Sequence, residues 1–268
     1  MKKILALVLA LAMVLSLAAC SSTPAESAAP TDAPAESAEA PAESADAPAD
    51  NAEPSVINVC LASEPDTIDP ALNSAVDGAT LTAHLFSGLA KWAQDENGNL
   101  EIVADAATEL PEGVTNEDGT VTYTYTLRDG MTWSDGQPVT AGDFAFAWKR
   151  AASTALAADY GYMFEVVDGY ADVWATDDAG NYVNPDAELN VVALDDKTLQ
   201  VTLSNAVAYW NELLAFPAYF PVREDVVANE AWATDPSTYV CNGPYTMASW
   251  DHNSVISLQK NPHYYDAD

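Results

Sequence analysis

From residue 55 to its end, the sequence predicts a mixed domain of the α/β or α+β class. Residues Val121–Leu127 alternate strictly between threonines and apolar or aromatic side chains, which is typical of a half-buried strand. Over Gly142–Ala152 the apolar residues recur every three or four positions, which predicts a helix. Similar strand-like and helix-like segments alternate along the rest of the chain, and this mixed order indicates one of the two classes.

The other strands are predicted from short apolar runs bounded by polar turn residues. Val56–Leu61 is mostly apolar and suits a buried strand. The turn-forming residues Asn116–Gly119 precede Val121–Leu127, so a hairpin is expected there. Further strands are expected at Asn190–Leu194 and Thr198–Leu203, as a second hairpin, and at Tyr245–Trp250 and Val255–Leu258.

The helix at Gly142–Ala152 has a recognisable start signal. Thr140 is followed three residues later by Asp143, as in a capping box with Asp in place of the usual Glu or Gln. A second helix is expected around Val207–Leu214 and a third over Asp225–Trp232.

Residues 1–20 have the layout of a lipoprotein signal peptide. Met1–Lys3 is basic and Ile4–Ala19 is almost entirely apolar. As a helix this apolar run would span roughly 24 Å, less than the ~30 Å hydrocarbon core of a bilayer. Leu17–Cys20 resembles the lipobox of bacterial lipoproteins, in which the cysteine is diacylated and becomes the new N-terminus. We therefore expect anchoring through Cys20, in preference to a plain secreted protein or an uncleaved anchor.

Residues 21–54 are predicted to be a disordered linker. They consist almost wholly of Ala, Pro, Ser, Asp and Glu, and Pro-Ala-Glu-Ser-Ala recurs at Pro24, Pro34 and Pro41. Such a segment buries too little apolar surface to offset its conformational entropy. Proline and repelling carboxylates favour an extended tether up to roughly 100 Å long, which separates a folded domain from the membrane.

The charge and the cysteines narrow the possible partners. A net charge of −32 predicts no nucleic-acid partner, because so acidic a surface repels phosphate backbones. Outside the cytoplasm a disulfide between Cys60 and Cys241 is permitted, but the sequence does not show whether they come within bonding reach. Two separately buried thiols is the favoured interpretation. Neither cysteine lies in a CxxC pair, so no redox or metal role is predicted for them.

No motif of a known catalytic or cofactor site occurs in the sequence. Phosphate-binding loops, GxGxxG, HExxH and GxSxG are all missing. The histidines His84, His252 and His263 are scattered, which predicts no metal site. Asp95–Asn99 resembles a calcium loop only superficially, since its glycine is the fourth residue and not the sixth, so a polar hairpin turn is expected. We expect no cofactor, no metal and no enzymatic activity.

Several segments together resemble a known family. They are Ala62–Pro70, His84–Leu89, Tyr125–Phe144 with Trp148–Arg150, Asp195–Leu203, Asn242–Tyr245 and Lys260–Tyr265. The longest block contains Leu-Arg-Asp-Gly-Met-Thr-Trp-Ser-Asp-Gly-Gln-Pro-Val-Thr-Ala-Gly-Asp-Phe. Over residues 55–268 this order is similar to family 5 of the bacterial extracellular solute-binding proteins, the oligopeptide- and dipeptide-binding components of ABC importers. The glycines of the block also suit tight turns, which indicates that the block mainly builds the fold. Its aromatic residues are therefore expected in the core.

The resemblance implies a periplasmic-binding-protein-like type II lobe with an inserted accessory domain. Residues 55–86 and 224–268 would form the first lobe, and residues 87–223 the accessory domain. The second lobe, which closes over the ligand in this family, is missing from the sequence. We therefore expect an N-terminal fragment, either of a truncated gene or at the end of a contig.

The resemblance also implies two ligand-contacting regions. Ser74, Ala75 and Val76 match the place where relatives pair their backbone with the peptide, and such pairing accepts any extended peptide. A relative carries an acidic residue at the position of Ser74, so a charge contact is in doubt there. Tyr160 matches a ligand-contacting tyrosine. The alternatives are a plain loop for Ser74–Val76 and an ordinary surface or packing aromatic for Tyr160.

The expected function is capture of oligopeptides outside the membrane and their delivery to the permease and ATPase subunits of an ABC importer. The protein would then be held on the periplasmic side or cell surface by its lipid anchor. The same fold with another solute, such as a nickel complex, haem, an opine or an oligosaccharide, is the alternative. A cell-surface hydrolase is less favoured, because no nucleophile or carboxylate pair is recognisable.

Overall fold

The computed structural model describes residues 55–267, and residues 58–268 form one compact unit. The predicted signal peptide at 1–20, its Cys20 and the predicted linker at 21–54 lie outside the described residues, so they stay predictions. None of the helices within 55–267 combines the length and the apolar character that crossing a membrane requires.

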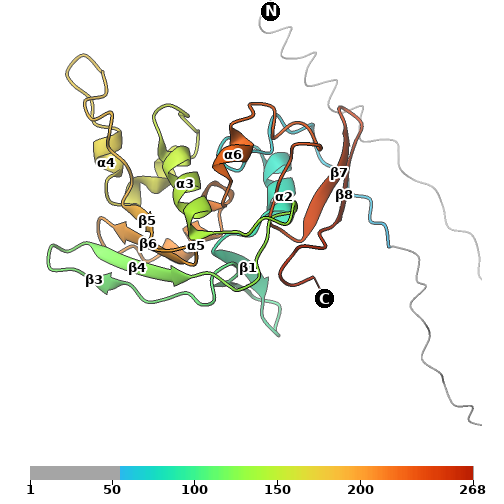
Figure 1. Cartoon of the computed structure of the whole chain (residues 1–268), viewed down its shortest axis with the longest axis horizontal. Helices are drawn as coiled ribbons and strands as arrows, with labels where there is room; N and C mark the ends of the chain where they lie inside the picture. Colours follow the sequence, from blue (N-terminus) through green and yellow to red (C-terminus); the bar gives the residue numbers. More distant parts are fainter. Residues whose placement is uncertain (1–54, 268) are drawn as a thin grey trace, which may run out of the picture. The chain divides into compact units, whose positions relative to one another are not determined.

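The described strands form three antiparallel sheets (Figure 1). The largest has the order β3 (Val114–Thr115), β4 (Val121–Thr126), β6 (Thr198–Leu203), β5 (Val191–Ala193). The other two are hairpins, β1 (Ala90–Gln94) with β2 (Leu100–Ala104), and β7 (Tyr245–Asp251) with β8 (Val255–Lys260). The predicted hairpins and the mixed class are therefore confirmed.

The described helices are mostly short. They are α2 (Val76–Leu85), α3 (Ala141–Ala152), α4 (Tyr170–Val173), α5 (Trp210–Leu214) and α6 (Glu224–Val227), with 3-10 helices η2 (Gly161–Val166) and η3 (Pro217–Tyr219). In Figure 1, α3 covers the β5–β6 side of the large sheet and α2 lies beside β7.

The capping box predicted for α3 is present. The Thr140 backbone N–H donates to the Asp143 carboxylate at 2.8 Å, and the Asp143 N–H donates to the Thr140 hydroxyl at 3.4 Å. Such a cap contributes on the order of 1 kcal/mol to helix stability. It fixes the start of the helix whose last turn carries Arg150, a residue of the candidate site below.

Aromatic side chains fill the space between α3 and the large sheet. The Trp148 indole N–H donates to the Tyr219 carbonyl at 2.8 Å, and the Trp210 indole N–H donates to the Tyr125 hydroxyl at 2.7 Å. Aromatic pairs of this kind contribute about 0.5–1.5 kcal/mol beyond the burial of their surface. Trp133, Phe144 and Trp148 are fully buried, so the prediction that aromatics of the longest block belong to the core is confirmed.

Three local predictions are wrong. Val56–Leu61 forms no strand and is largely exposed, because no strand within the described residues pairs with its backbone. The expected helix Asp225–Trp232 is reduced to α6, which is followed by turns. The prediction of two buried thiols is wrong for Cys60, which is exposed with the 56–61 segment, while Cys241 is buried. The two thiols are unpaired, as the favoured interpretation had it.

Helix α2 was not predicted, and its composition explains why. Its buried face includes Asp77, Gly78 and Thr82 beside two leucines, so apolar periodicity does not reveal it. Tertiary packing against β7 stabilises the helix where local propensity does not.

Candidate functional site

The chain before α2 makes a tight turn centred on Asp69, which is 1% exposed. The Asp69 carboxylate accepts the backbone N–H of Ala71 at 2.9 Å. Its carbonyl accepts the N–H groups of Leu72 at 3.1 Å and Asn73 at 2.9 Å. These bonds fix the path of the chain directly before Ser74.

Arg150, in the last turn of α3, holds this turn through an ion pair. Its guanidinium donates twice to the Asp69 carboxylate, at 3.1 and 2.6 Å, and its side chain is only 16% exposed. Bidentate pairs of this type are strong and geometrically specific. Breaking a buried pair by removing one partner costs about 3–5 kcal/mol, so the position of the turn depends on α3.

Ser74, Ala75 and Val76 lie together at the start of α2, with their side chains exposed. Ala75 is the residue before the first helical turn and is extended, with φ −110° and ψ 150°. The Asn73 side-chain amide donates to the Ala75 carbonyl at 3.1 Å and accepts the Ala75 N–H at 3.4 Å. The backbone of this stretch is thus held by one buried side chain.

Tyr160 belongs to another part of the chain than Ser74–Val76. It is the residue directly before η2 and is half-buried. Its ring meets Phe216 edge-on at 5.0 Å between centroids and Tyr162 at 6.2 Å. Within residues 55–267, no hydrogen bond or aromatic contact joins Tyr160 to Ser74–Val76. What the two regions share is α3, since Arg150 fixes the turn before Ser74 and Tyr160 follows the end of that helix.

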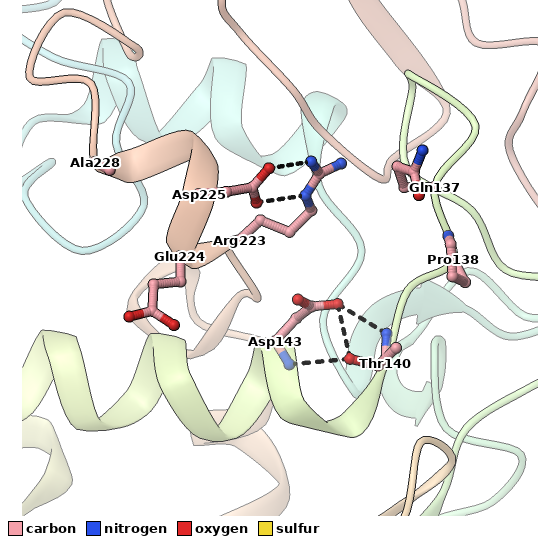
Figure 2. Close-up of a pocket in the computed structure, with 8 residues that line it drawn as sticks. All are labelled: Gln137, Pro138, Thr140, Asp143, Arg223, Glu224, Asp225 and Ala228. Atoms are coloured by element: carbon pink, nitrogen blue, oxygen red, sulfur yellow. Dashed lines mark hydrogen bonds and ion pairs between the residues drawn. The ribbon is translucent and has the colours of Figure 1, made fainter.

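Two cavities of the described part are lined by other residues than these. Figure 2 shows one of about 570 Å³, lined by Gln137, Pro138, Thr140, Asp143, Arg223, Glu224, Asp225 and Ala228. Its one cation, Arg223, already pairs with Asp225 and with Asp135. Burial raises the pKa of Asp143, whose carboxylate is used by the capping box and the Trp133 indole. Arg223 and Asp143 thus already have partners within the protein, whereas the Glu224 side chain makes no ion pair among the described residues.

A second cavity, of about 660 Å³, lies between residues 165–171 and 205–209 and also contains none of the predicted site residues. Across residues 55–267, no group of three or more His, Cys, Asp or Glu side chains is placed as a metal site requires. Ser74–Val76 is an exposed edge of the chain that lines neither of these cavities.

Comparison with known proteins defines the family. Residues 101–268 match the family described as bacterial extracellular solute-binding proteins, family 5 Middle. The chain belongs to this family. The relatives described in the next paragraph are named as binding proteins, which agrees with the expected fold and with a binding role.

The relatives of this family member include oligopeptide-binding proteins. The oligopeptide-binding protein OppA of Bacillus subtilis is 35% identical over 217 residues, covering 80% of this chain and 37% of that protein. OppA of Listeria monocytogenes, solved bound to peptide, has a TM-score of 0.64 at 33% identity and covers 76% of this chain and 38% of that one. The probable deoxycholate-binding periplasmic protein YgiS of Escherichia coli is also 35% identical, over 216 residues. The family member described here spans under two fifths of the length of each.

Three residues that support the predicted edge were missed from the sequence. Asp69 lies in one of the segments that resemble the family, and Arg150 lies at the end of another. Nothing in their spacing indicates that they pair across 81 positions. Asn73 directly precedes Ser74, and a polar residue before a helix start is the signal that could have drawn attention to it.

Proposed function

We propose that the complete protein is the substrate-binding component of an ABC importer. It captures oligopeptides outside the membrane and passes them to the permease and ATPase subunits. The observation that carries this proposal is the 35% identity to the oligopeptide-binding protein OppA of Bacillus subtilis over 217 residues, which cover 80% of this chain. The likeness to a Listeria monocytogenes OppA solved with peptide supports the same ligand class.

In this proposal the peptide pairs its backbone with Ser74–Val76 and contacts Tyr160. The exposure of the first region and the extended conformation of Ala75 support main-chain pairing, which gives affinity without selecting side chains. Residues 55–86 and 224–268 then belong to one lobe and 87–223 to an accessory domain, and a second lobe encloses the peptide. Enclosure is required because ligand sites bury most of the ligand surface.

The same proposal places the protein on the outer side of the membrane. The basic start, the apolar run and the small residues before Cys20 support a signal peptide and a diacylated cysteine. Intact-mass analysis of membrane-extracted protein tests this part, and a mature N-terminus other than Cys20 would refute it.

A second candidate ligand has its own observation. YgiS, named as probably deoxycholate-binding, is as similar in identity as the Bacillus subtilis OppA. A steroid acid needs an apolar pocket, whereas the described edge offers backbone polar groups, so peptides remain the first choice. Nickel complexes, haem, opines and oligosaccharides are further alternatives within the fold, and a hydrolase is the least favoured.

Calorimetry separates these possibilities. We expect the product of the complete gene to bind a pool of tri- to pentapeptides, and residues 55–268 alone to bind it far more weakly, because one wall leaves the peptide largely hydrated. Deoxycholate is the comparison ligand. Binding of deoxycholate without peptide binding would show that the proposed ligand is wrong. Equal peptide affinity of the complete protein and of residues 55–268 would show that the proposed site is wrong.

A further inference from the structure

The second cavity, of about 660 Å³, is formed where three segments of the chain meet. It is lined by Glu165 and Val166 from the end of η2, by Tyr170 and Ala171 from the start of α4, and by residues 205–209 from the stretch between β6 and α5. Sites for small molecules typically occupy roughly 300–1,000 Å³. The cavity is therefore large enough to take up a small ligand.

The cavity has one charged side chain, the Glu165 carboxylate. None of the residues that line it is a lysine, an arginine or a histidine. Across residues 55–267 the Glu165 side chain makes no ion pair, whereas the exposed Glu188 is paired with Lys149. Its negative charge is thus uncompensated within the described part of the chain. The net charge of −32 adds to the attraction that a cation experiences there.

Two tyrosines, Tyr170 and Tyr209, line the same cavity as this carboxylate. Burial and, after it, the nearby Glu165 carboxylate raise the pKa of Tyr170, so its phenol is neutral at neutral pH. The face of an aromatic ring attracts a cation that lies within about 6 Å of the ring centre. Most of the other lining residues are alanines and valines. This lining suits a cation with an apolar body better than a metal ion, which needs several oxygen ligands.

Contacts with the rest of the fold fix the walls of the cavity. The Ser204 N–H donates to the Val166 carbonyl at 3.0 Å, so the end of η2 is held beside the end of β6. The Tyr170 ring stacks on Trp174 at 6.0 Å between centroids. The Trp174 indole N–H in turn donates to the Ala152 carbonyl at 2.9 Å. Because these walls are already held in place, a ligand loses little of its binding free energy to ordering them.

We propose that this cavity binds an organic cation, a primary ammonium group on an apolar stem. The Glu165 carboxylate accepts hydrogen bonds from the ammonium group, and bonds between charged partners are the stronger class. The rings of Tyr170 and Tyr209 lie beside the cation and its stem. The site shares no residue with Ser74–Val76 or Tyr160, and it does not depend on the proposed capture of peptides.

Phenethylamine and phenethyl alcohol test the class of ligand, because they differ only in an ammonium group against a hydroxyl group. The product of the complete gene is titrated with each at neutral pH and followed by NMR, with the tri- to pentapeptide pool in excess to occupy the proposed peptide site. We expect the amine to bind at least about threefold more tightly than the alcohol. Equal affinity of the two would overturn the assignment to a cation. If the protein binds no peptide, the proposed function fails, while the same titration without the pool still tests the cavity.

Glu165→Gln locates the site, because it removes the charge and keeps the size of the side chain. Glu112→Gln is the matched control, since Glu112 is also exposed, makes no ion pair among the described residues and lies outside the cavity. We expect Glu165→Gln to weaken phenethylamine binding roughly threefold to tenfold, and Glu112→Gln to leave it unchanged. Equal affinity of these two variants would overturn the assignment of Glu165.

Tyr209→Ala tests the aromatic wall in the same titration. Tyr209 is 54% exposed, so its removal is expected to leave the melting temperature nearly unchanged. We expect phenethylamine to bind roughly twofold to fivefold more weakly, as the loss of one exposed cation–π contact predicts. Unchanged affinity would show that the Tyr209 ring does not contact the cation and would overturn its role.

Discussion

The two ends of helix α2 are held by asparagine side chains that make the same pair of hydrogen bonds. At the start, Asn73 binds both the N–H and the carbonyl of Ala75. Beyond the end, Asn242 accepts the Ser87 N–H at 3.0 Å and donates to the Ser87 carbonyl at 3.0 Å. The chemistry is identical, but the surroundings are not.

The difference lies in burial and in sequence separation. Ser87 and Asn242 are both buried and stand 155 positions apart, so their bonds join two distant parts of the fold. Ala75 is exposed and only two positions from Asn73, so that pair shapes a local edge. Unpaired backbone groups cost most where water cannot replace the lost partner. We therefore expect the Asn242 contact to contribute more to stability than the Asn73 contact, which shapes the edge proposed for binding.

The largest effect is expected from the ion pair that supports the near end. Arg150→Met leaves the buried Asp69 carboxylate without its cation and is expected to lower the free energy of unfolding by about 3–5 kcal/mol. Lys149→Met is the matched control, since the neighbouring Lys149 makes an exposed pair with Glu188, which is worth roughly 0–1 kcal/mol. Urea unfolding of both variants measures the difference. Similar losses in the two would show that burial does not separate the pairs.

Asn242→Ala is expected to come next. It leaves the Ser87 N–H and carbonyl buried without partners, at about 1–3 kcal/mol for each group before relaxation. Peptide affinity, compared at a temperature where the variant is folded, is expected to be unchanged. A loss of affinity without a loss of stability would reverse the roles assigned to the two ends.

Cys241 provides a local probe of this variant, because it directly precedes Asn242. Burial raises the pKa of the Cys241 thiol to about 12, so little thiolate is present at neutral pH. The raised pKa stabilises the fold below pH ~9, and that contribution is lost as the pH rises towards 12. Maleimide labelling followed by peptide mapping is expected to modify exposed Cys60 quickly and Cys241 only on opening, faster in Asn242→Ala than in Asn73→Ala. Equal Cys241 rates in the two variants would contradict the comparison.

The same contrast explains what the sequence could predict. The capping box of Thr140 and Asp143 and the hairpin around Asn116–Gly119 depend on neighbours within a few residues, and both are present. The Asn242–Ser87 and Arg150–Asp69 contacts span 155 and 81 positions, and local patterns hold no information on them. The resemblance to the family includes these segments, but it does not show which residues they contact.

The near end of α2 shows why the candidate site itself was only partly predicted. Resemblance indicated Ser74–Val76, but the helix that begins there was invisible, because Gly78 and Thr82 on its buried face break the apolar period. The path of the stretch follows from the φ and ψ of Ala75 and the bonds of Asn73, and these are set by the surrounding fold. Tyr160 gains its place from Phe216, which is distant in sequence.

The smallest effect on stability is expected from substitutions of Asn73. The variant Asn73→Asp tests whether the Asn73 amide donates to the Ala75 carbonyl. The introduced carboxyl keeps an acceptor for the Ala75 N–H but places its second oxygen against the Ala75 carbonyl, where the amide now donates at 3.1 Å. Above its pKa the ionised group repels that carbonyl, so its folded-state pKa is expected to rise above the usual ~3.9. Because protonation restores a donor, the variant is expected to lose about 1 kcal/mol at pH 7 and to recover it as the pH falls through that raised value. Asn73→Ala, with no titrating group, is the control for urea unfolding between pH 4 and 7. A constant difference between the two variants over this range would show that the Asn73 amide does not donate to Ala75.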